Sequence, residues 1–401
     1  MSSKAMGITL AERAAQLSPS PTLALDAKTK ALIAAGQDVV NFTAGEPDFD
    51  TPAHIRQAGV KAIEGGQTRY TAVGGTVALK AAVADRLLLD TGLTYQPNEI
   101  LVSVGAKHSL YNAIMALVSP GDGVLVPVPY WVTYPEQILL AGGRVERVAT
   151  APAQRHQLRR DDLERVVTPA TRGLILNSPC NPSGAVIPPL ALQEIAAFAV
   201  DHDLFVLSDE IYGRLVYGGA QQVSIARYPG MRERTIVISG VSKSYAMTGW
   251  RIGYAAGPAP VIQAMANLQS QSTSNPTSIA QAAAAAALAG PQQAVEEMRQ
   301  EFDRRRQYAV EQIRRIPGLA VDAPDGAFYL WVDMAGVVGR TLAGREIRNA
   351  DDLGLAWLEQ SGVAVVPGSG FGVPNYFRMS YATSMAKLEQ GLTRMRSLLE
   401  A

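Results

Sequence analysis

Three polar residues follow short apolar runs at positions where their side chains could take part in chemistry. Asn181 lies four residues beyond the run GLILN, Asp209 lies directly beyond LFVLS, and Lys243 lies four residues beyond TIVIS. The intervals of 28 and 34 residues between them each suit one strand–helix repeat. Because open parallel sheets bind ligands beyond the carboxyl ends of their strands, we predict that the three side chains meet at one edge of a sheet.

The residue types in this group indicate a particular chemistry. A lysine whose pKa is lowered by its surroundings can attack a carbonyl group. Arg251, eight residues beyond Lys243 in a glycine-rich segment, suits a phosphate group. A carboxylate at a strand end can hold a pyridine nitrogen in its protonated form. Together these groups are the parts of a pyridoxal-phosphate site, which needs a Schiff-base lysine and a partner for the ring nitrogen.

Short apolar runs alternate with helical stretches through the middle of the chain. This alternation predicts an α/β fold with a mainly parallel sheet that helices cover on both faces. The alanine-rich run 282–289 ends at a Gly-Pro pair and is expected to be a buried helix. The expected strands are 100–104, 124–128, 145–148, 173–177, 204–208 and 235–239, with helices near 107–118 and 191–201.

The pattern changes after about residue 290. Apolar residues at helical spacing predict one long helix over 292–316, which Pro317–Gly318 ends. We then expect strands over 327–332 and 363–366, and helices over 351–360 and 384–399.

These two patterns predict a two-domain chain. A large cofactor-binding domain is expected over 49–300 and a smaller α+β domain over 301–401. Residues 1–48 are expected to form an N-terminal arm and part of the small domain.

Composition excludes several classes of protein. The 401 residues are 47% hydrophobic and 18% charged, which is typical of a globular chain. Equal numbers of basic and acidic residues, 36 each, give no electrostatic reason to expect nucleic-acid or anionic-membrane binding. The single cysteine rules out an internal disulfide, and the four histidines lack the spacing of a metal site, so no metal is expected. No apolar run is long enough to span a membrane and no secretory signal is visible, so we expect a cytoplasmic protein.

Five segments resemble motifs of one family, the class I pyridoxal-phosphate-dependent aminotransferases. The segment around Lys243, GVSKSYAMTGWRIG over 240–253, is similar to the family's cofactor-attachment pattern along its whole length. The other four are AGEPDFDTP at 44–52, YWVTYP at 130–135, NSPCNPSG at 177–184 and FRMSYA at 377–382. The likeness spans about residues 20–385 and is closest to bacterial aspartate aminotransferases. It implies a fold-type-I transferase that binds pyridoxal 5′-phosphate and works as a homodimer.

The resemblance implies a role for each residue near the cofactor ring. Lys243 would form the Schiff base and, once substrate displaces it, move the proton from the substrate Cα. Asp209 would pair with the ring nitrogen, and Asn181 and Tyr212 would donate hydrogen bonds to the ring oxygen. From residue type alone, Asp209 could instead cap a following helix, and Asn181 could serve only its turn.

The resemblance also implies how the rest of the cofactor is held. Arg251 would bind the phosphate, and Trp131 would stack on the ring unless it is simply a core tryptophan. Tyr70 is similar to a tyrosine that reaches the phosphate of the neighbouring subunit, which implies a site completed by a homodimer. The helix N-terminus expected to assist Arg251 through backbone N–H groups consists of Gly105, Ala106 and Lys107.

One position departs from the family pattern. Some relatives carry a serine three residues before the lysine, where this chain has Gly240. Ser239 or Ser242 could supply the missing hydroxyl, and Ser242 is included in the expected cofactor site.

The substrate is expected to be an amino acid held by its α-carboxylate. Arg378 is the implied partner of that carboxylate, although a structural ion pair is the alternative. Gly45, which has no side chain, would let its backbone N–H approach the same group. Asn181 and Trp131 are also expected to border the substrate.

Aspartate aminotransferases bind the distal carboxylate of the substrate in one of two ways. One aspartate aminotransferase branch uses an arginine before a Ser-Asn-Pro segment, but residues 268–274 here contain no basic residue. The other branch uses a lysine after the glycine-rich turn, and Lys107 matches it unless it is a surface lysine, with Ser20 and Thr22 expected to assist. We therefore expect L-aspartate and 2-oxoglutarate to give oxaloacetate and L-glutamate. Prephenate or an aromatic amino acid, and less readily a C–S β-lyase substrate, are the alternatives.

Overall fold

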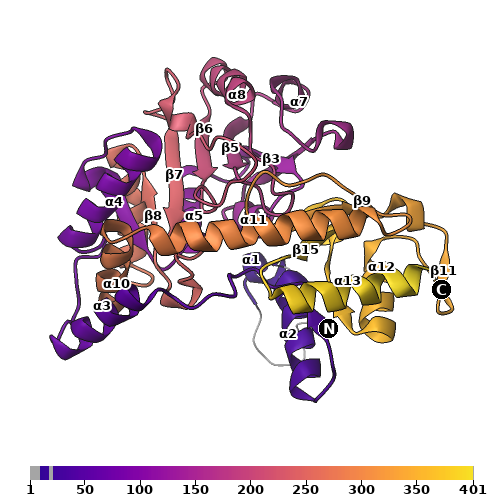
Figure 1. Ribbon diagram of the computed structural model, residues 1–401. Coiled ribbons are helices and arrows are strands. Elements are labelled where there is room, and N and C mark those ends of the chain that lie inside the picture. The colour runs from indigo at the N-terminus through magenta and orange to yellow at the C-terminus, as the bar shows by residue number, and fades with distance from the viewer. Residues whose placement is uncertain (1–9, 18–20, 401) are drawn as a thin grey trace.

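The computed structural model describes residues 10–17 and 21–400, and these form two units joined by a long helix (Figure 1). The first unit is built on a seven-stranded sheet and the second on a four-stranded antiparallel sheet. Helix α11 (Gln293–Arg314) runs across both units (Figure 1).

The seven-stranded sheet is mainly parallel, as the sequence predicts. Six of its strands point the same way, and only β8 is antiparallel to its two neighbours. In spatial order the strands are β2 (Ile100–Ser103), β8 (Gly253–Ala256), β7 (Thr235–Gly240), β6 (Phe205–Asp209), β5 (Thr171–Asn177), β3 (Gly123–Val128) and β4 (Arg144–Ala149).

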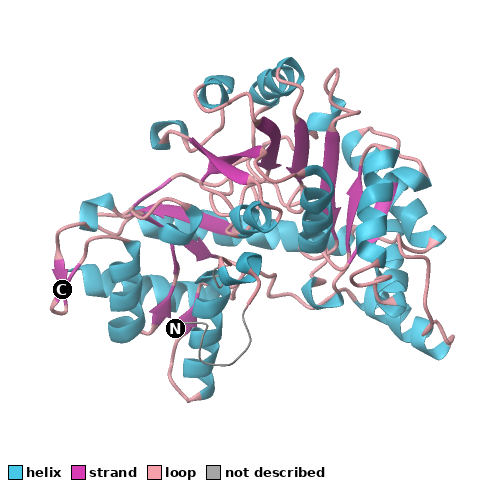
Figure 2. Cartoon of the chain, turned by 180° about the vertical axis from the view of Figure 1, so that it is seen from behind, coloured by secondary structure: helices cyan, strands magenta, loops and turns pink. Residues whose placement is uncertain are grey.

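Helices pack on both faces of this sheet (Figure 2). Along β6, Leu207 packs into the first face while Val206 packs into the second. Because side chains alternate along a strand, Asp209 shares the face of Leu207. The first face is covered by α5 (Ala106–Leu117), α6 (Thr133–Leu140) and α9 (Ala259–Ser270). The second is covered by α3 (Ala53–Glu64), α4 (Val77–Thr91), α7 (Arg160–Glu164), α8 (Pro189–Asp201) and α10 (Ser278–Ala289).

The alanine-rich run forms α10 and is buried against α3 and α4, as expected. Its small side chains let neighbouring helices come close. Among the described residues, no helix combines the length and apolar character needed to cross a membrane.

The second unit combines an antiparallel sheet with helices, as expected for an α+β domain. Strand β15, which carries Arg378, pairs with β10 and β14. In spatial order this sheet is β14 (Val366–Pro367), β15 (Tyr376–Ser380), β10 (Tyr329–Asp333) and β9 (Ala320–Val321). Further elements beyond α11 include α12 (Ala350–Ala356), α13 (Met385–Glu400) and the hairpin strands β11 (Thr341–Leu342) and β12 (Arg345–Glu346).

The N-terminal part of the chain joins this second unit. Strand β1 (Val40–Asn41) pairs in parallel with β13 (Val363–Ala364). Two helices, α1 (Glu12–Ala15) and α2 (Pro21–Ala34), precede β1. Phe42, directly after β1, is completely buried in the core of the second unit.

Two details of the second unit differ from the sequence prediction. The single strand expected over 363–366 is divided between β13 and β14, which belong to different sheets. The helix expected over 351–360 is α-helical only to Ala356 and continues as one π-helical turn to Ser361. Gly362, at a φ of 61°, then ends it in the left-handed conformation that glycine favours.

The central strand of the large sheet should carry much of the stability of the first unit. Leu207→Ala leaves a cavity at a side chain with no exposed surface, so unfolding in urea should require about 2–5 kcal/mol less. Leu190→Ala on α8, where the leucine is 78% exposed, is the matched control and should change stability by less than about 0.5 kcal/mol. Equal urea midpoints for the two cofactor-free variants would contradict this assignment of the core.

Candidate active site

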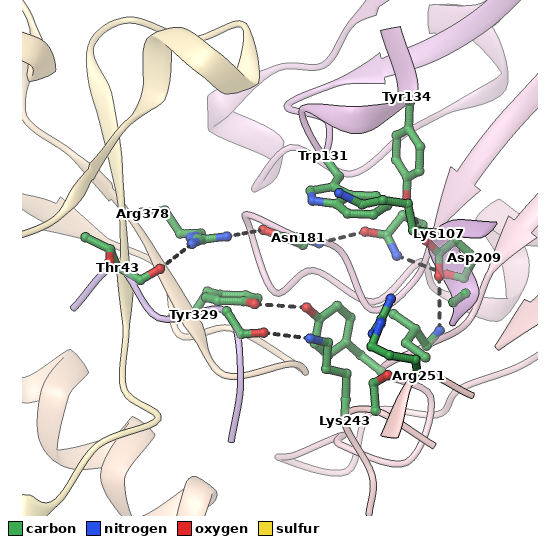
Figure 3. Close-up of a pocket in the computed structure, with 16 residues that line it drawn as sticks. Thr43, Lys107, Trp131, Tyr134, Asn181, Asp209, Lys243, Arg251, Tyr329 and Arg378 are labelled. Atoms are coloured by element: carbon green, nitrogen blue, oxygen red, sulfur yellow. Dashed lines mark hydrogen bonds between the residues drawn. The ribbon is translucent and has the colours of Figure 1, made fainter. Parts of the chain in front are cut away.

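A cavity of about 240 Å³ lies between the carboxyl edge of the large sheet and the second unit (Figure 3). Thr43, Gly45, Tyr329 and Arg378 line it from the side of the second unit. The first unit contributes Ala106, Lys107, Trp131, Tyr134, Asn177, Asn181, Asp209, Ile211, Tyr212, Ser242, Lys243 and Arg251. The cavity therefore contains Asn181, which follows β5, Asp209, which ends β6, and Lys243, which follows β7.

Lys243 extends its amine into the cavity from the segment after β7. Its Nζ donates a hydrogen bond of 2.6 Å to the backbone carbonyl of Gly45 (Figure 3). Burial lowers the pKa of Lys243 to about 8, with Glu46 acting in the opposite direction and the nearby guanidinium groups adding to the decrease. A substantial fraction of the amine is therefore neutral near physiological pH and able to act as a nucleophile or a base.

Asp209 is buried at the end of β6, and its carboxylate is held from two sides. Tyr134 donates its hydroxyl to Oδ2 at 2.8 Å, and the backbone N–H of Ile211 donates to Oδ1 at 3.2 Å. Burial raises the pKa of Asp209 to about 6, although the hydrogen bonds from Tyr134 and Ile211 act to lower it. The residue after β6 enters a turn rather than a helix, so the helix-capping interpretation of Asp209 is wrong.

Arg378 reaches the cavity from β15 and is only 3% exposed. Its guanidinium donates to Asn181 Oδ1 at 2.9 Å and to the carbonyl of Thr43 at 2.8 Å, while its Nε has no hydrogen-bond partner (Figure 3). No carboxylate within the described ranges forms an ion pair with it, so the structural ion pair considered from the sequence is absent there. A buried cation facing a cavity in this way is a strong binding site for a carboxylate.

Tyr212 and Tyr329 form a hydroxyl pair beside Arg378. Their oxygens lie 2.9 Å apart, and the Tyr329 ring lies 4.3 Å from the Arg378 guanidinium carbon. Burial raises the pKa of both phenols, so both are protonated hydrogen-bond donors at neutral pH. The pair therefore joins Tyr212 of the first unit to Tyr329, whose ring contacts the Arg378 guanidinium on β15.

The N-terminus of α5 and Arg251 form a small cationic cradle. Gly105 caps α5 at a φ of 85°, and a Cβ atom there would overlap the Arg251 guanidinium. A Cβ atom on Gly253 would overlap the backbone nitrogen of Ala106. These glycines let Arg251 lie beside the unpaired N–H groups of α5, an arrangement that suits a phosphate.

Trp131 and Lys107 form another part of the cavity wall. The Lys107 Nζ lies 4.9 Å from the centre of the Trp131 ring, and Trp131 meets Tyr134 edge to face. Burial lowers the pKa of Lys107, with Arg251 adding to the effect. Lys107 therefore lines the cavity while the residue stays exposed to solvent, a position that agrees with both interpretations considered from the sequence.

Most of the expected site residues lie together, and the remaining ones are placed as follows. Ser242 lines the cavity, whereas Ser239 lines a different cavity together with Glu210 and Tyr254. Tyr70 does not line the cavity, and its side chain is 91% exposed. Gly105 contributes through its backbone at the start of α5. Ser20 and the side chain of Thr22 lie outside the described residues.

Gly240 has a packing reason of its own. A Cβ atom there would lie 2.9 Å from both the Gly253 Cα and the carbonyl oxygen of Ile252. The close approach of β7 and β8 therefore favours glycine where some relatives carry serine.

Sequence reasoning gave no role to five residues that line the cavity. Tyr134 and Asn177 lie inside motifs that we recognised, so their presence was signalled but their functions were not. Thr43 contributes a backbone carbonyl, which a residue type cannot reveal. The remaining two are Ile211 and Tyr329, and Tyr329 follows from the register of β10 on β15.

Comparison with known proteins places the chain in a family. The pattern of the family described as aminotransferase class I and II matches residues 37–395. The chain is a class I and II aminotransferase. An aspartate aminotransferase of Geobacillus stearothermophilus is 47% identical, over 98% of this chain and 99% of the relative. An aspartate/prephenate aminotransferase of Nitrosomonas europaea is 43% identical, over 97% of this chain and 99% of the relative.

A solved structure supports the same assignment. The crystal structure of the aspartate aminotransferase from Rhizobium meliloti superposes with a TM-score of 0.95 at 42% identity and covers 98% of this chain and 99% of that one. The fold of this aminotransferase is thus the fold-type-I transferase fold that the sequence predicts.

The cavity of this aminotransferase has the chemical groups that pyridoxal phosphate requires. The cradle of Arg251 and the α5 N-terminus suits the phosphate, and it would be filled by a Cβ atom on Gly105. Asp209 presents a buried carboxylate, and Lys243 presents an amine of lowered pKa. The donor set therefore fits the cofactor that the family implies.

The lowered pKa of Lys243 has a consequence for stability. Between about pH 8 and the ordinary lysine value of 10.5, the unfolded chain binds more protons than the folded protein, so stability rises with pH. The buried amine therefore lowers stability fully below pH 8. In the cofactor-free protein, Lys243→Met should raise the free energy of unfolding at pH 7 by about 1–3 kcal/mol. This range is smaller than the full pKa shift would give, because the side chain as a whole is only partly buried and solvent screens its charge.

Urea unfolding of cofactor-free protein at several pH values would check this prediction. The gain from Lys243→Met should shrink steadily as the pH rises from about 8 toward 10.5. Lys61→Met, at an exposed site on α3, is the control and should change stability by less than about 0.5 kcal/mol. A gain that does not vary with pH would contradict the lowered pKa.

Proposed function

We propose that this aminotransferase binds pyridoxal 5′-phosphate at Lys243 and transfers the amino group of L-aspartate to 2-oxoglutarate. The observation that carries the proposal is the presence in one cavity of the Lys243 amine and the buried Arg378 guanidinium, for which the described chain supplies no carboxylate. The first group suits amine chemistry on a carbonyl compound, and the second suits the α-carboxylate common to all amino acids. Aspartate as the amino-group donor agrees with the two relatives, which are an aspartate and an aspartate/prephenate aminotransferase.

The cofactor, when bound, supplies an aldehyde that combines with amines and a ring that accepts the electrons released when the substrate loses its α-proton. Arg251 and the N–H groups at the start of α5 would hold its phosphate, and Trp131 would face its ring. Asp209 would hold a proton on the ring nitrogen, and Asn181 and Tyr212 would donate hydrogen bonds to the ring oxygen. Ser242, which lines the cavity, would offer its hydroxyl to the phosphate.

Lys243 would act as the proton carrier of the reaction. Its pKa of about 8 makes the neutral amine far more common near pH 7 than in an ordinary lysine, so its Nζ would take up and carry the proton of the substrate Cα. Arg378, with the backbone N–H of Gly45, would orient the substrate by its α-carboxylate. With the substrate oriented in this way, the Lys243 amine is the group proposed to take up the Cα proton.

We further propose that Lys107 reads the distal carboxylate of the substrate. Among the described residues, four cationic side chains line the cavity. Three of them, Lys243, Arg251 and Arg378, already have proposed roles, and Lys107 is the fourth. Prephenate, which also carries a distal carboxylate, is the second candidate substrate. The Nitrosomonas europaea relative, an aspartate/prephenate aminotransferase, supports it.

Side-by-side turnover of aspartate, prephenate, phenylalanine and cystathionine would test the substrate assignment. Lys107→Met should lower kcat/KM for aspartate roughly ten- to a hundredfold, because a hydrogen bond to a charged group is lost, and leave phenylalanine within about threefold. Lys80→Met is the control, because Lys80 on α4 does not line the cavity and its amine donates to the backbone carbonyl of Pro97. Negligible aspartate turnover by the wild type would remove the first choice.

We also propose that the enzyme is a homodimer in which Tyr70 reaches the phosphate of the neighbouring site. Tyr70 and Val77 are 91% and 87% exposed, which is unusual for apolar side chains of this size. Pairing of two chains through this surface would cover them and bring Tyr70 to a second cavity. The cytoplasmic location stays a prediction.

Mixing two inactive variants would test the shared site. Tyr70→Ala damages the neighbouring site and Lys243→Ala damages its own site, so each alone should be nearly inactive. A heterodimer places both substitutions in one site, and the other site becomes wild type. Refolding an equal mixture should therefore recover about a quarter of wild-type activity. No recovery, with both variants folded and dimeric by sedimentation, would contradict the contribution of Tyr70 to the neighbouring site.

We also propose that the domain boundaries lie at residues 48 and 300. The pairing of β1 with β13 supports placing the N-terminal arm with the small domain. Helix α11 crosses the second boundary without a break, so the two domains would be joined by a rigid element.

A further inference from the structure

The segment 42–52 connects β1 to α3 without regular secondary structure, and its residues Thr43 and Gly45 line the cavity. Two of its backbone carbonyls accept hydrogen bonds from the functional cations. Thr43 accepts from Arg378, and Gly45 accepts from Lys243 (Figure 3). We call this segment the 42–52 loop.

Both of these hydrogen bonds involve groups that change partners in the proposed reaction. Lys243 would bind the cofactor and carry a proton, and Arg378 would bind the substrate carboxylate. The loop is also held outside the cavity, since Thr248 donates to Glu46 Oε2 at 2.8 Å and Thr51 donates to the carbonyl of Ala246 at 2.6 Å. Residues 47–50, which lie between these two contacts, have a further anchor of their own.

Arg305 of α11 supplies such an anchor. Its Nη1 donates to Asp48 Oδ1 at 2.7 Å, and its Nε donates to Glu301 Oε1 at 2.8 Å. The Arg305 side chain is only 8% exposed, and its guanidinium lies 5.1 Å from the Phe49 ring and 5.7 Å from the Phe302 ring. Phe49 in turn packs edge to face on Phe302, with ring centres 5.3 Å apart.

We infer that Arg305, through Asp48 and Phe49, is a positioning residue that fixes the 42–52 loop for substrate binding. The inference rests on the proposed function, because the substrate carboxylate would meet Arg378 and the backbone of Gly45. None of the atoms in the anchor lines the cavity, so the anchor stays intact while the cavity contacts are exchanged. Its location on α11 also ties the loop to the helix that crosses both units (Figure 1).

The test uses the holoenzyme and compares Asp48→Asn, Arg305→Met and the double variant. Each single substitution should raise KM for aspartate and the dissociation constant of succinate, an unreactive dicarboxylate, roughly three- to tenfold, with kcat within about twofold. The double variant should be no worse than the weaker-binding single variant, because both substitutions break the same interaction. Amide hydrogen exchange over residues 43–50 should be at least about tenfold faster.

Matched controls lie next to each tested residue. Asp50→Asn changes the same loop at an exposed position, and Arg304→Gln changes an exposed neighbour of Arg305 that also contacts Glu301. Both controls should keep wild-type KM and succinate binding. Asp48→Glu, which keeps the charge, should restore much of the affinity lost in Asp48→Asn.

A purely structural anchor gives a different result. The inference is overturned if the variants lower the thermal midpoint but keep wild-type KM, succinate binding and loop exchange, or if the effects of the two substitutions add. Failure of the proposed function is separate, since it would show as wild-type protein that neither attaches the cofactor nor turns over aspartate. Loop exchange tests the anchor in that case as well.

Discussion

The desolvation of the Lys243 amine is the interaction on which the rest of the site depends. A lysine at the ordinary pKa of 10.5 would be an ammonium ion, unable to attack a carbonyl or accept a proton. Burial between two units makes the charged form costly, and Arg251 and Arg378 add to that cost. The carboxylates nearby do not cancel it. Asp209 is engaged by Tyr134 and Ile211, and its electrostatic influence on Lys243 is smaller than that of burial.

Several cationic side chains and few carboxylates line the cavity. Repulsion between these cations lowers the stability of the cofactor-free protein. Arg378 relies on neutral acceptors, the amide of Asn181 and the carbonyl of Thr43, which satisfy its N–H groups without neutralising its charge. A substrate carboxylate can therefore replace weaker partners instead of competing with a resident carboxylate. The same argument applies to Arg251, which lies beside a helix N-terminus of the same sign. The anionic groups that the site lacks are those that a phosphorylated cofactor and an amino acid would bring.

The geometry of the site depends on contacts between segments far apart in the chain. The hydrogen bond from Arg378 to Thr43 joins residues 335 positions apart, and the bond from Lys243 to Gly45 joins residues 198 apart. The large sheet fixes Asn181, Asp209 and Lys243 relative to one another, since β5, β6 and β7 are neighbours in one ladder. The second unit and the 42–52 loop then close the cavity from the other side.

The sequence by itself determined the order and type of most elements and the chemistry of the main residues. Apolar runs and helical spacing are local properties, so β5, β6, β7, α10 and α11 could be predicted within a few residues. Only the tertiary structure decided that 363–366 is divided between two sheets, because strand pairing depends on distant partners. It also decided that Ser242 and not Ser239 faces the cavity, and that Tyr134, Tyr329 and the carbonyl of Thr43 take part. The physical reason is that burial, register and backbone direction arise from packing between distant segments, and no local pattern of residue types contains them.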